Sequence, residues 1–315
     1  MRRHPTAATH MPPESVNPTL SWNLARDLAE VVEYHFMVNA LLAGSIVAVM
    51  AGVVGWLMVL RRQAFAGHTL SMMAFPGASG ASLIGIPAAW GYFAFCAVGA
   101  LAIGRFSSRA GGSMREQGAM IGAVQATALA LGFLFVSLYG GVLGDLESLL
   151  FGDILAISDG QLVLLAAVAL AVLAALGALA RPLLFASVDP DVARARGVRV
   201  RLLSGSFLLL LAAAVAATSQ ITGPLLVFAL LVAPAATAQL ITVRPALSLA
   251  LSVLFGLLIV WLGMGIAYFS IYPAGFFIST IAFVLYLLVR LCVGLRARGP
   301  RARRVGATPV GEAVA

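Results

Sequence analysis

Lysine is absent from this 315-residue chain, so every strongly basic side chain is an arginine. A chain without lysine can form neither the phosphate-binding P-loop nor a Schiff-base nucleophile. Any ATP hydrolysis linked to this protein is therefore expected in another chain. Cysteine is nearly absent as well, since Cys96 and Cys292 lie in separate apolar segments at opposite ends of the sequence. Their separation excludes a disulfide framework and a Cys-x-x-Cys metal site.

Charge of either sign is scarce, and this decides the class of protein. Charged residues make up 10% of the chain and hydrophobic residues 61%, with a mean hydropathy of +1.01. Soluble domains contain roughly 25% charged and 45–50% apolar residues. The composition therefore predicts a polytopic membrane protein.

The first 36 residues differ from the rest because they contain little apolar sequence and no hydrophobic core of a signal peptide. We expect a flexible leader over residues 1–36, in which residues 24–33 have the periodicity of a short interfacial helix. Three of the four histidines fall here. Solvated histidines are favoured over a metal-collecting tail. The prolines that interrupt this segment are Pro5, Pro12, Pro13 and Pro18.

Apolar segments long enough to cross a bilayer fill residues 37–295. A membrane-spanning helix needs about 20 apolar residues, and breaks at arginine, glycine and proline predict an all-α bundle of about eight to nine transmembrane helices. The second span is diluted by glycine and serine, and only Gln220 and Ile221 separate the sixth from the seventh; re-entrant segments are the alternative at both places. The predicted spans are 37–60, 64–85, 88–104, 117–140, 160–180, 202–219, 222–243, 246–268 and 277–295.

Arginines follow alternate spans, which predicts the topology. By the positive-inside rule the arginine-rich connections face the cytoplasm, so the N-terminus lies outside and the C-terminus inside. The basic residues 296–315 directly follow a span and are interpreted as a cytoplasmic tail that contacts lipid rather than nucleic acid. Asp145, Glu147 and Asp153 occupy an outer connection. They could form an external vestibule that attracts cations, or Asp153 could order an interfacial turn.

The connection after the fifth span carries signals for a short helix at about 189–197. Asp189 suits the N-cap, Pro190 the first helical position, and Asp191 the positive end of the helix dipole. Gly197 can close the helix in a left-handed conformation. Such a helix fits a rigid contact with a cytoplasmic partner, and a surface helix bound to anionic lipid explains the caps equally well.

Four motifs occur in an order that resembles a known family. Asp189-Pro190-Asp191 with Ala193 and Gly197 is similar to D-P-E-x-A-x-x-x-G, and residues 225–238 (LLVFALLVAPAATA) are similar to L-L-V-x-A-L-L-x-x-P-A-A-x-A. Residues 150–155 (LFGDIL) and 67–77 (GHTLSMMAFPG) follow two further patterns, L-F-G-D-I-L and G-D-x-L-S-H-A-x-x-P-G. Across residues 37–295 the chain resembles the permeases of ABC importers for zinc, manganese and iron.

The resemblance implies a multi-pass permease in a bacterial plasma membrane. It implies partnership with a second permease copy, a cytoplasmic ABC ATPase subunit and an extracytoplasmic metal-binding protein. ATP would be used by the ATPase, the divalent metal would be transported rather than bound permanently, and this chain would not itself be an enzyme. Residues 189–197 would form the coupling helix that docks on the ATPase.

His68 and Met72 occupy the positions where that family places an acidic residue and a histidine facing the translocation path. The spacing of four puts both side chains on one helix face, and imidazole with thioether can bind a soft or borderline metal. Pro76 also leaves the Met72 carbonyl without its helical donor. Alternatively, Met72 fills space in the core and His68 forms a hydrogen bond between helices.

We therefore interpret the chain as the permease subunit of an ATP-driven importer of zinc, manganese or iron that works by alternating access. A gradient-driven secondary transporter of a small cation or metabolite is the alternative. It would need titratable residues within the bilayer, and no Asp, Glu or Arg lies well inside the predicted spans. A membrane-embedded enzyme would need clustered catalytic groups that the sequence lacks.

Overall fold

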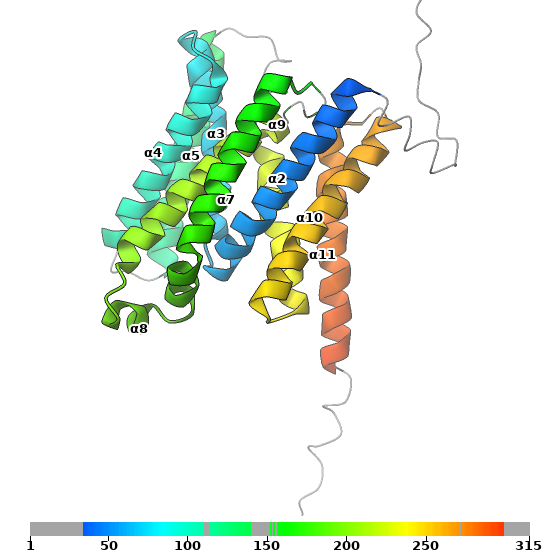
Figure 1. Ribbon diagram of the computed structural model, residues 1–315. Helices are drawn as coiled ribbons and strands as arrows, with labels where there is room; N and C mark the ends of the chain where they lie inside the picture. The colour runs from blue at the N-terminus through cyan, green and yellow to red at the C-terminus, as the bar shows by residue number, and fades with distance from the viewer. Residues whose placement is uncertain are drawn as a thin grey trace, which may run out of the picture.

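The computed structural model describes residues 34–109, 114–139, 152, 154, 156–270 and 272–298. These residues form a bundle of long helices, and no strand occurs among them (Figure 1). Asp145, Glu147 and Asp153, and nearly all of the predicted leader, lie outside the described residues. The first helix begins at His35, two residues before the predicted first span.

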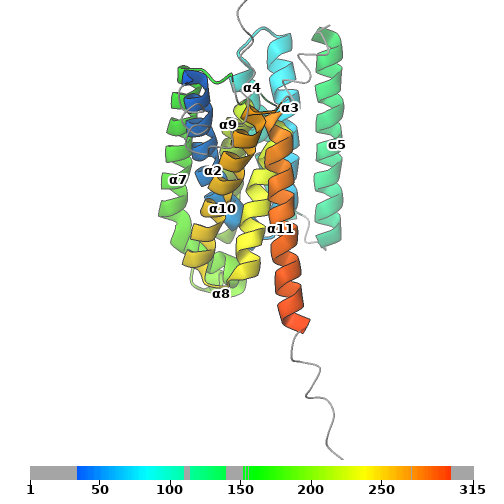
Figure 2. The same cartoon turned by 90° about the vertical axis from the view of Figure 1, so that its right-hand side faces the viewer.

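Nine helices are assigned within these described ranges. They are α2 (His35–Leu60), α3 (Ala64–Leu83), α4 (Ala88–Arg109), α5 (Met114–Tyr139), α7 (Asp159–Val188), α8 (Pro190–Ala195), α9 (Val200–Ile241), α10 (Pro245–Tyr268) and α11 (Ala274–Arg298). All except α8 run roughly along one axis (Figure 2). This confirms the predicted polytopic helical bundle.

Seven of the described helices are long and apolar enough to cross a membrane, and α3 is not one of them. Its 20 residues still measure about 30 Å, the thickness of the hydrocarbon core. Most of its side chains are buried because α4, α5 and α9 pack around it. A helix enclosed by protein needs few lipid-facing apolar residues, which explains the glycine and serine that weaken its hydropathy.

Helix α9 is two spans joined by a sharp break at Gly223. The residue has φ 71° and ψ 157°, a combination that glycine tolerates, and its extended ψ is what a following proline requires. Near its start, Ser204 accepts a hydrogen bond from Arg61, and near its end Gln239 donates to the Trp56 carbonyl. Both ends of α9 therefore lie beside the same end of α2. The sixth and seventh predicted spans are confirmed as separate arms, and the break falls just beyond Ile221.

Small residues allow close approach of the helices. A Cβ added to Gly77 would lie 2.4 Å from the Gly91 carbonyl oxygen of α4. In the same way, a Cβ on Gly55 of α2 would lie 2.0 Å from the Leu231 carbonyl oxygen of α9. Only glycine permits the backbones to pack this closely.

The connections divide between two ends of the bundle. Residues 61–63, 189–199 and 242–244 lie at one end together with α8, and we call this the arginine-rich end (Figure 1). Residues 84–87, 156–158, 269–270 and 272–273 lie at the opposite end. The arginine-bearing connections that alternate along the sequence thus lie together at one end of the bundle.

Candidate functional site

His68 lies in the second turn of α3, where α3 meets α5 and the second arm of α9. Its Nε2 atom is 3.1 Å from Nε2 of Gln125 on α5. Its ring packs against the ring of Phe228 on α9, with centroids 4.6 Å apart and an interplanar angle of 56°. The structure therefore brings together two motifs that are far apart in the sequence, residues 67–77 and 225–238.

The two ring nitrogens of His68 have different surroundings. Nε2 contacts the Gln125 amide, whereas Nδ1 is buried and has no hydrogen-bond partner among the described residues. An unpaired buried polar atom is destabilising by about 1–3 kcal/mol. A metal ion that binds Nδ1 would remove this penalty while it is bound.

Met72 is 6% exposed and lies one helical turn beyond His68. Residues at this spacing share a helix face, so the thioether and the imidazole are presented on one side of α3. No group of three or more His, Cys, Asp or Glu side chains that could hold a metal occurs within the described ranges. The donors that this face of α3 offers are therefore Nδ1 of His68 and the Met72 thioether, a set suited to weak binding of a passing ion rather than permanent retention.

Arg61, between α2 and α3, ties three helices together at the arginine-rich end. It donates hydrogen bonds to Ser187 of α7 (3.1 Å) and Ser204 of α9 (2.8 Å), and its guanidinium lies 5.2 Å from the centre of the Phe207 ring. Partial burial lowers the pKa of Arg61 from its ordinary value. The two serines lie on the helices that enter and leave α8, so Arg61 joins both flanks of α8 to the start of α3.

Helix α8 has the caps that the sequence predicted. Oδ1 of Asp189 accepts hydrogen bonds from the backbone N–H groups of Asp191 (3.1 Å) and Val192 (2.9 Å). Gly197 has φ 83°, and its N–H donates to the Arg194 carbonyl. The helix itself spans Pro190–Ala195, shorter than the predicted 189–197 because the terminal residues are caps.

One side of α8 faces the bundle and the other is open. Ala193 is fully buried within this chain, so its side chain anchors α8 instead of reaching a partner. Val192 and Val188 are exposed, at 44% and 81%, and Arg194 and Arg196 are exposed beside them. Arg194 pairs with the exposed Asp191, so the open side combines apolar contact area with the ion pair and the additional positive charge of Arg196.

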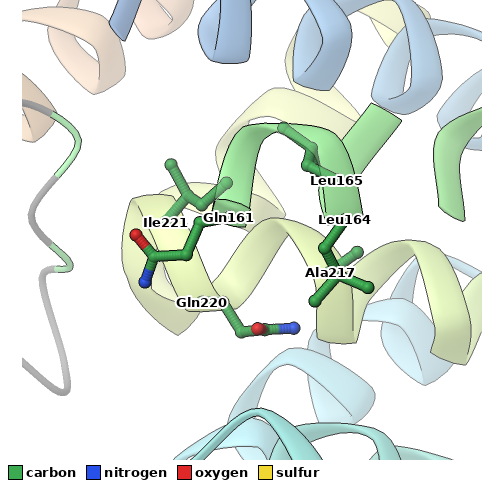
Figure 3. Close-up of a pocket in the computed structure, with 6 residues that line it drawn as sticks. All are labelled: Gln161, Leu164, Leu165, Ala217, Gln220 and Ile221. Atoms are coloured by element: carbon green, nitrogen blue, oxygen red, sulfur yellow. The ribbon is translucent and has the colours of Figure 1, made fainter. Parts of the chain in front are cut away.

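A small pocket lies near the opposite end of the bundle, between the start of α7 and the end of the first arm of α9 (Figure 3). Its polar groups are Gln161 and Gln220, whose amides point away from one another in Figure 3. Gln161 belongs to the capping box of α7 with Ser158, and Gln220 donates to the Ala216 carbonyl. Both amides are therefore engaged in helix stabilisation. The remaining lining residues are Leu164, Leu165, Ala217 and Ile221.

Three polar side chains also meet at this opposite end. Oδ1 of Asp159 lies 3.2 Å from Nε2 of His35 and accepts a hydrogen bond from Asn39 at 2.6 Å. The His35 and Asp159 side chains are mostly exposed, and exposed ion pairs contribute little to stability. The contact links the beginnings of α2 and α7, so His35 is part of the bundle rather than of the leader.

Sequence reasoning missed Gln125, Phe228 and the partners of Arg61. Gln125 had a usable signal, because a glutamine inside an apolar span is costly unless it binds something. Phe228 carried no signal, since an aromatic residue is ordinary in a membrane helix.

The polar residues beside Pro234 satisfy backbone carbonyls: Thr237 donates to Ala233, and Gln239 donates to Trp56.

Comparisons with known proteins found similarity along most of the chain. The model of the ABC 3 transport family matches residues 33–293. The chain is 32% identical over 295 residues to the manganese transport system membrane protein MntC of Halalkalibacterium halodurans, which covers 91% of this chain and 99% of that protein. It is also 32% identical over 208 residues to the manganese import system permease protein ScaB of Streptococcus parasanguinis, covering 66% and 73% of the two chains.

A solved structure has the same architecture. A chain of PsaBC from Streptococcus pneumoniae in complex with Fab aligns with a TM-score of 0.74 and 29% sequence identity. The alignment covers 84% of the present chain and 95% of that chain.

Proposed function

The chain belongs to the ABC 3 transport family, and we propose from this premise that it is the membrane-spanning permease subunit of an ATP-driven importer for transition-metal ions. The observation that carries the proposal is α8, a capped helix with an open side at the arginine-rich end. The proposal assigns this end to the cytoplasm by the positive-inside rule. The N-terminus would then lie outside and the C-terminus inside.

In this proposal α8 is the coupling helix. A cytoplasmic ATPase binds its open side through Val192 and the neighbouring arginines, while buried Ala193 keeps the helix fixed to the bundle. Rigid attachment matters because a partner can displace a helix bundle only through an element that does not itself deform. The caps at Asp189 and Gly197 provide that rigidity.

The metal path in this proposal passes the junction of α3, α5 and α9. An external binding protein delivers the ion, and His68 and Met72 offer it nitrogen and sulfur as the bundle alternates between outward and inward access. A second permease copy completes the complex. The relatives are named as manganese proteins, whereas imidazole and thioether favour zinc or ferrous iron over manganese, so the metal must be determined by measurement.

The test is uptake by a bacterial strain that lacks its own manganese, zinc and iron importers. The permease is expressed with its cognate ATPase and binding protein, and accumulation of the three metals is measured side by side. We expect uptake that requires the ATPase and stops when the ATPase active site is inactivated. Uptake that persists without a functional ATPase would contradict the proposal and support a gradient-driven transporter.

Coupling is tested separately with Gly197→Val. A Cβ at Gly197 meets no atom within 4 Å, so the variant has space, but a β-branched residue resists a φ of 83°. We expect normal insertion and at least a severalfold loss of the co-purified ATPase. Gly205→Val serves as the matched control, since a Cβ at Gly205 also meets no atom within 4 Å and Gly205 itself does not have a positive φ.

A further inference from the structure

We infer that Gln125 is a positioning residue for the transported metal: its amide oxygen accepts the Nε2–H of His68 and thereby leaves the Nδ1 lone pair as the metal-binding atom. This inference rests on the proposed function and deepens it, because it names the ligating atom of His68. Gln125 lies on α5, in a predicted span, and no motif of the sequence analysis includes it.

Three short contacts involve the Gln125 amide or the Thr69 hydroxyl beside it. Nε2 of Gln125 lies 3.1 Å from Nε2 of His68, and Oε1 of Gln125 lies 3.3 Å from Oγ1 of Thr69. The Thr69 hydroxyl also lies 3.2 Å from the Phe65 carbonyl oxygen. A hydroxyl has one hydrogen, so Thr69 cannot donate to both of these oxygens at full strength.

Turning the amide by 180° satisfies all three contacts at once. The nitrogen and oxygen of a glutamine amide exchange places with almost no change in shape. With the amide turned, Thr69 donates to the Phe65 carbonyl and accepts from the Gln125 NH₂ group. The Gln125 oxygen then accepts from Nε2–H of His68, and no hydrogen is shared between two acceptors.

The amide orientation also fixes the tautomer of His68. If Gln125 donated to Nε2, the proton would reside on Nδ1, which is buried without an acceptor. A buried N–H group without an acceptor is rare in folded proteins. With the amide turned, Nδ1 instead carries a free lone pair, and a metal ion can bind a lone pair but not an N–H group.

This arrangement has the form that metal-ligating histidines generally adopt. Such a histidine donates its second ring N–H to an oxygen, which fixes the ring and raises the basicity of the ligating nitrogen. Gln125 would supply that oxygen, and Thr69 would hold the amide in the required orientation. Phe228 covers the ring from the second arm of α9.

The tautomer can be measured directly on the full-length chain. The other histidines, His4, His10 and His35, are replaced by glutamine so that His68 is the sole histidine. Solid-state NMR of ¹⁵N-histidine-labelled protein in lipid then shows which nitrogen is protonated. We expect the Nε2–H tautomer and a shift of the Nδ1 resonance when Zn²⁺ is added. A protonated Nδ1 that does not respond to Zn²⁺ would overturn the inference.

Variants of Gln125 provide the functional test. Gln125→Glu keeps an oxygen acceptor and should retain most of the metal uptake, whereas Gln125→Met has similar size but no acceptor and should reduce uptake roughly 10- to 100-fold. The inference would be contradicted if Gln125→Met took up as much metal as the wild type, or if Gln125→Glu took up as little metal as Gln125→Met.

Gln239→Met is the matched control for loss of a glutamine hydrogen bond. Gln239 donates across helices to the Trp56 carbonyl and has no contact with His68, so this variant should lower thermal stability without changing the ratio of manganese to zinc uptake. Failure of the proposed function would be distinguishable, because the wild-type complex would then show no ATP-dependent uptake although the NMR result would stand.

Discussion

Two regions of the bundle differ in whether their buried polar groups have hydrogen-bond partners. Along the seam between α2, α10 and the second arm of α9, the polar groups are paired. Trp56 donates to Ser248 at 3.0 Å, and Ser252 donates to the Gly52 carbonyl at 2.9 Å. This seam is a closed set of interhelical hydrogen bonds.

The segment that leads into α3 leaves polar atoms unpaired. Nε of Arg61, Oε1 of Gln63 and Nδ1 of His68 are buried without hydrogen-bond partners, and within the described ranges only Oγ of Ser219 shares this property. Three of these four atoms fall within eight residues of sequence. Unpaired buried polar atoms lower stability. Their concentration in residues 61–68 therefore indicates that this segment serves binding or movement rather than stability.

The largest effect of a substitution is expected where the backbones of α2 and α9 approach most closely along the seam. A side chain at Gly55 would collide with the Leu231 backbone rather than with a movable side chain. Gly55→Val should lower the free energy of unfolding by about 3 kcal/mol or more, seen as loss of monodisperse protein in detergent. Gly177→Val, at a position with no atom within 4 Å, should leave the yield unchanged. Equal yields would show that the seam tolerates separation of its helices.

His68→Ala should abolish metal uptake but lower thermal stability only slightly, because loss of the Gln125 hydrogen bond and the Phe228 contact is partly offset by removal of a buried nitrogen without a partner. His68→Asp should retain part of the uptake, since a carboxylate restores the acidic residue found in the resembling family and favours harder ions. The measurements are metal accumulation and melting temperature in detergent. A large loss of stability in both variants, with His68→Asp less stable than His68→Ala, would instead show that His68 has a structural role.

Arg61 combines both behaviours, since two of its nitrogens are paired with serines and Nε is not. Arg61→Lys keeps the charge but cannot reach both serines with a planar fork. We expect a severalfold rise in ATP hydrolysed per metal ion transported, measured in proteoliposomes. An unchanged ratio would show that Arg61 only packs the arginine-rich end. Arg62→Lys is the control, because Arg62 is exposed.

Trp56→Phe is expected to have the smallest effect, and it tests whether the seam contributes only to stability. It removes one donor to Ser248 from a paired interface, so stability should fall by about 1 kcal/mol. Uptake and metal preference should remain as in the wild type. A changed preference would mean that the seam also belongs to the metal path.

The sequence predicted what depends on local chemistry. Hydropathy located the spans because a helix in the bilayer needs apolar residues of its own. Asp189 and Gly197 located α8 because capping residues act within one helical turn. Helix α3 had the weakest hydropathy signal because other helices, rather than lipid, surround it. The break in α9 was placed near Gln220 rather than Gly223 because polarity is easier to read than backbone conformation.

Long-range pairing could not be read from the sequence. Gln125 and His68 are 57 residues apart, and nothing local to either residue names the other. The same holds for Arg61 with Ser187 and Ser204, because these contacts depend on how α7 and α9 return to the arginine-rich end. The chemistry of a single residue was predictable, whereas its partner was a property of the packing.

The break at Gly223 determines the route by which movement travels along the chain. The first arm of α9 follows α8 directly, and the second arm carries Phe228 to His68. Along the backbone, a displacement that starts at α8 must travel the full height of the bundle, turn at Gly223 and return. At the turn, Gly152 packs so closely that an added Cβ would lie 2.4 Å from the Gly223 nitrogen. The first arm of α9 thus runs to the opposite end of the bundle before the second arm, five residues beyond the break, reaches the histidine.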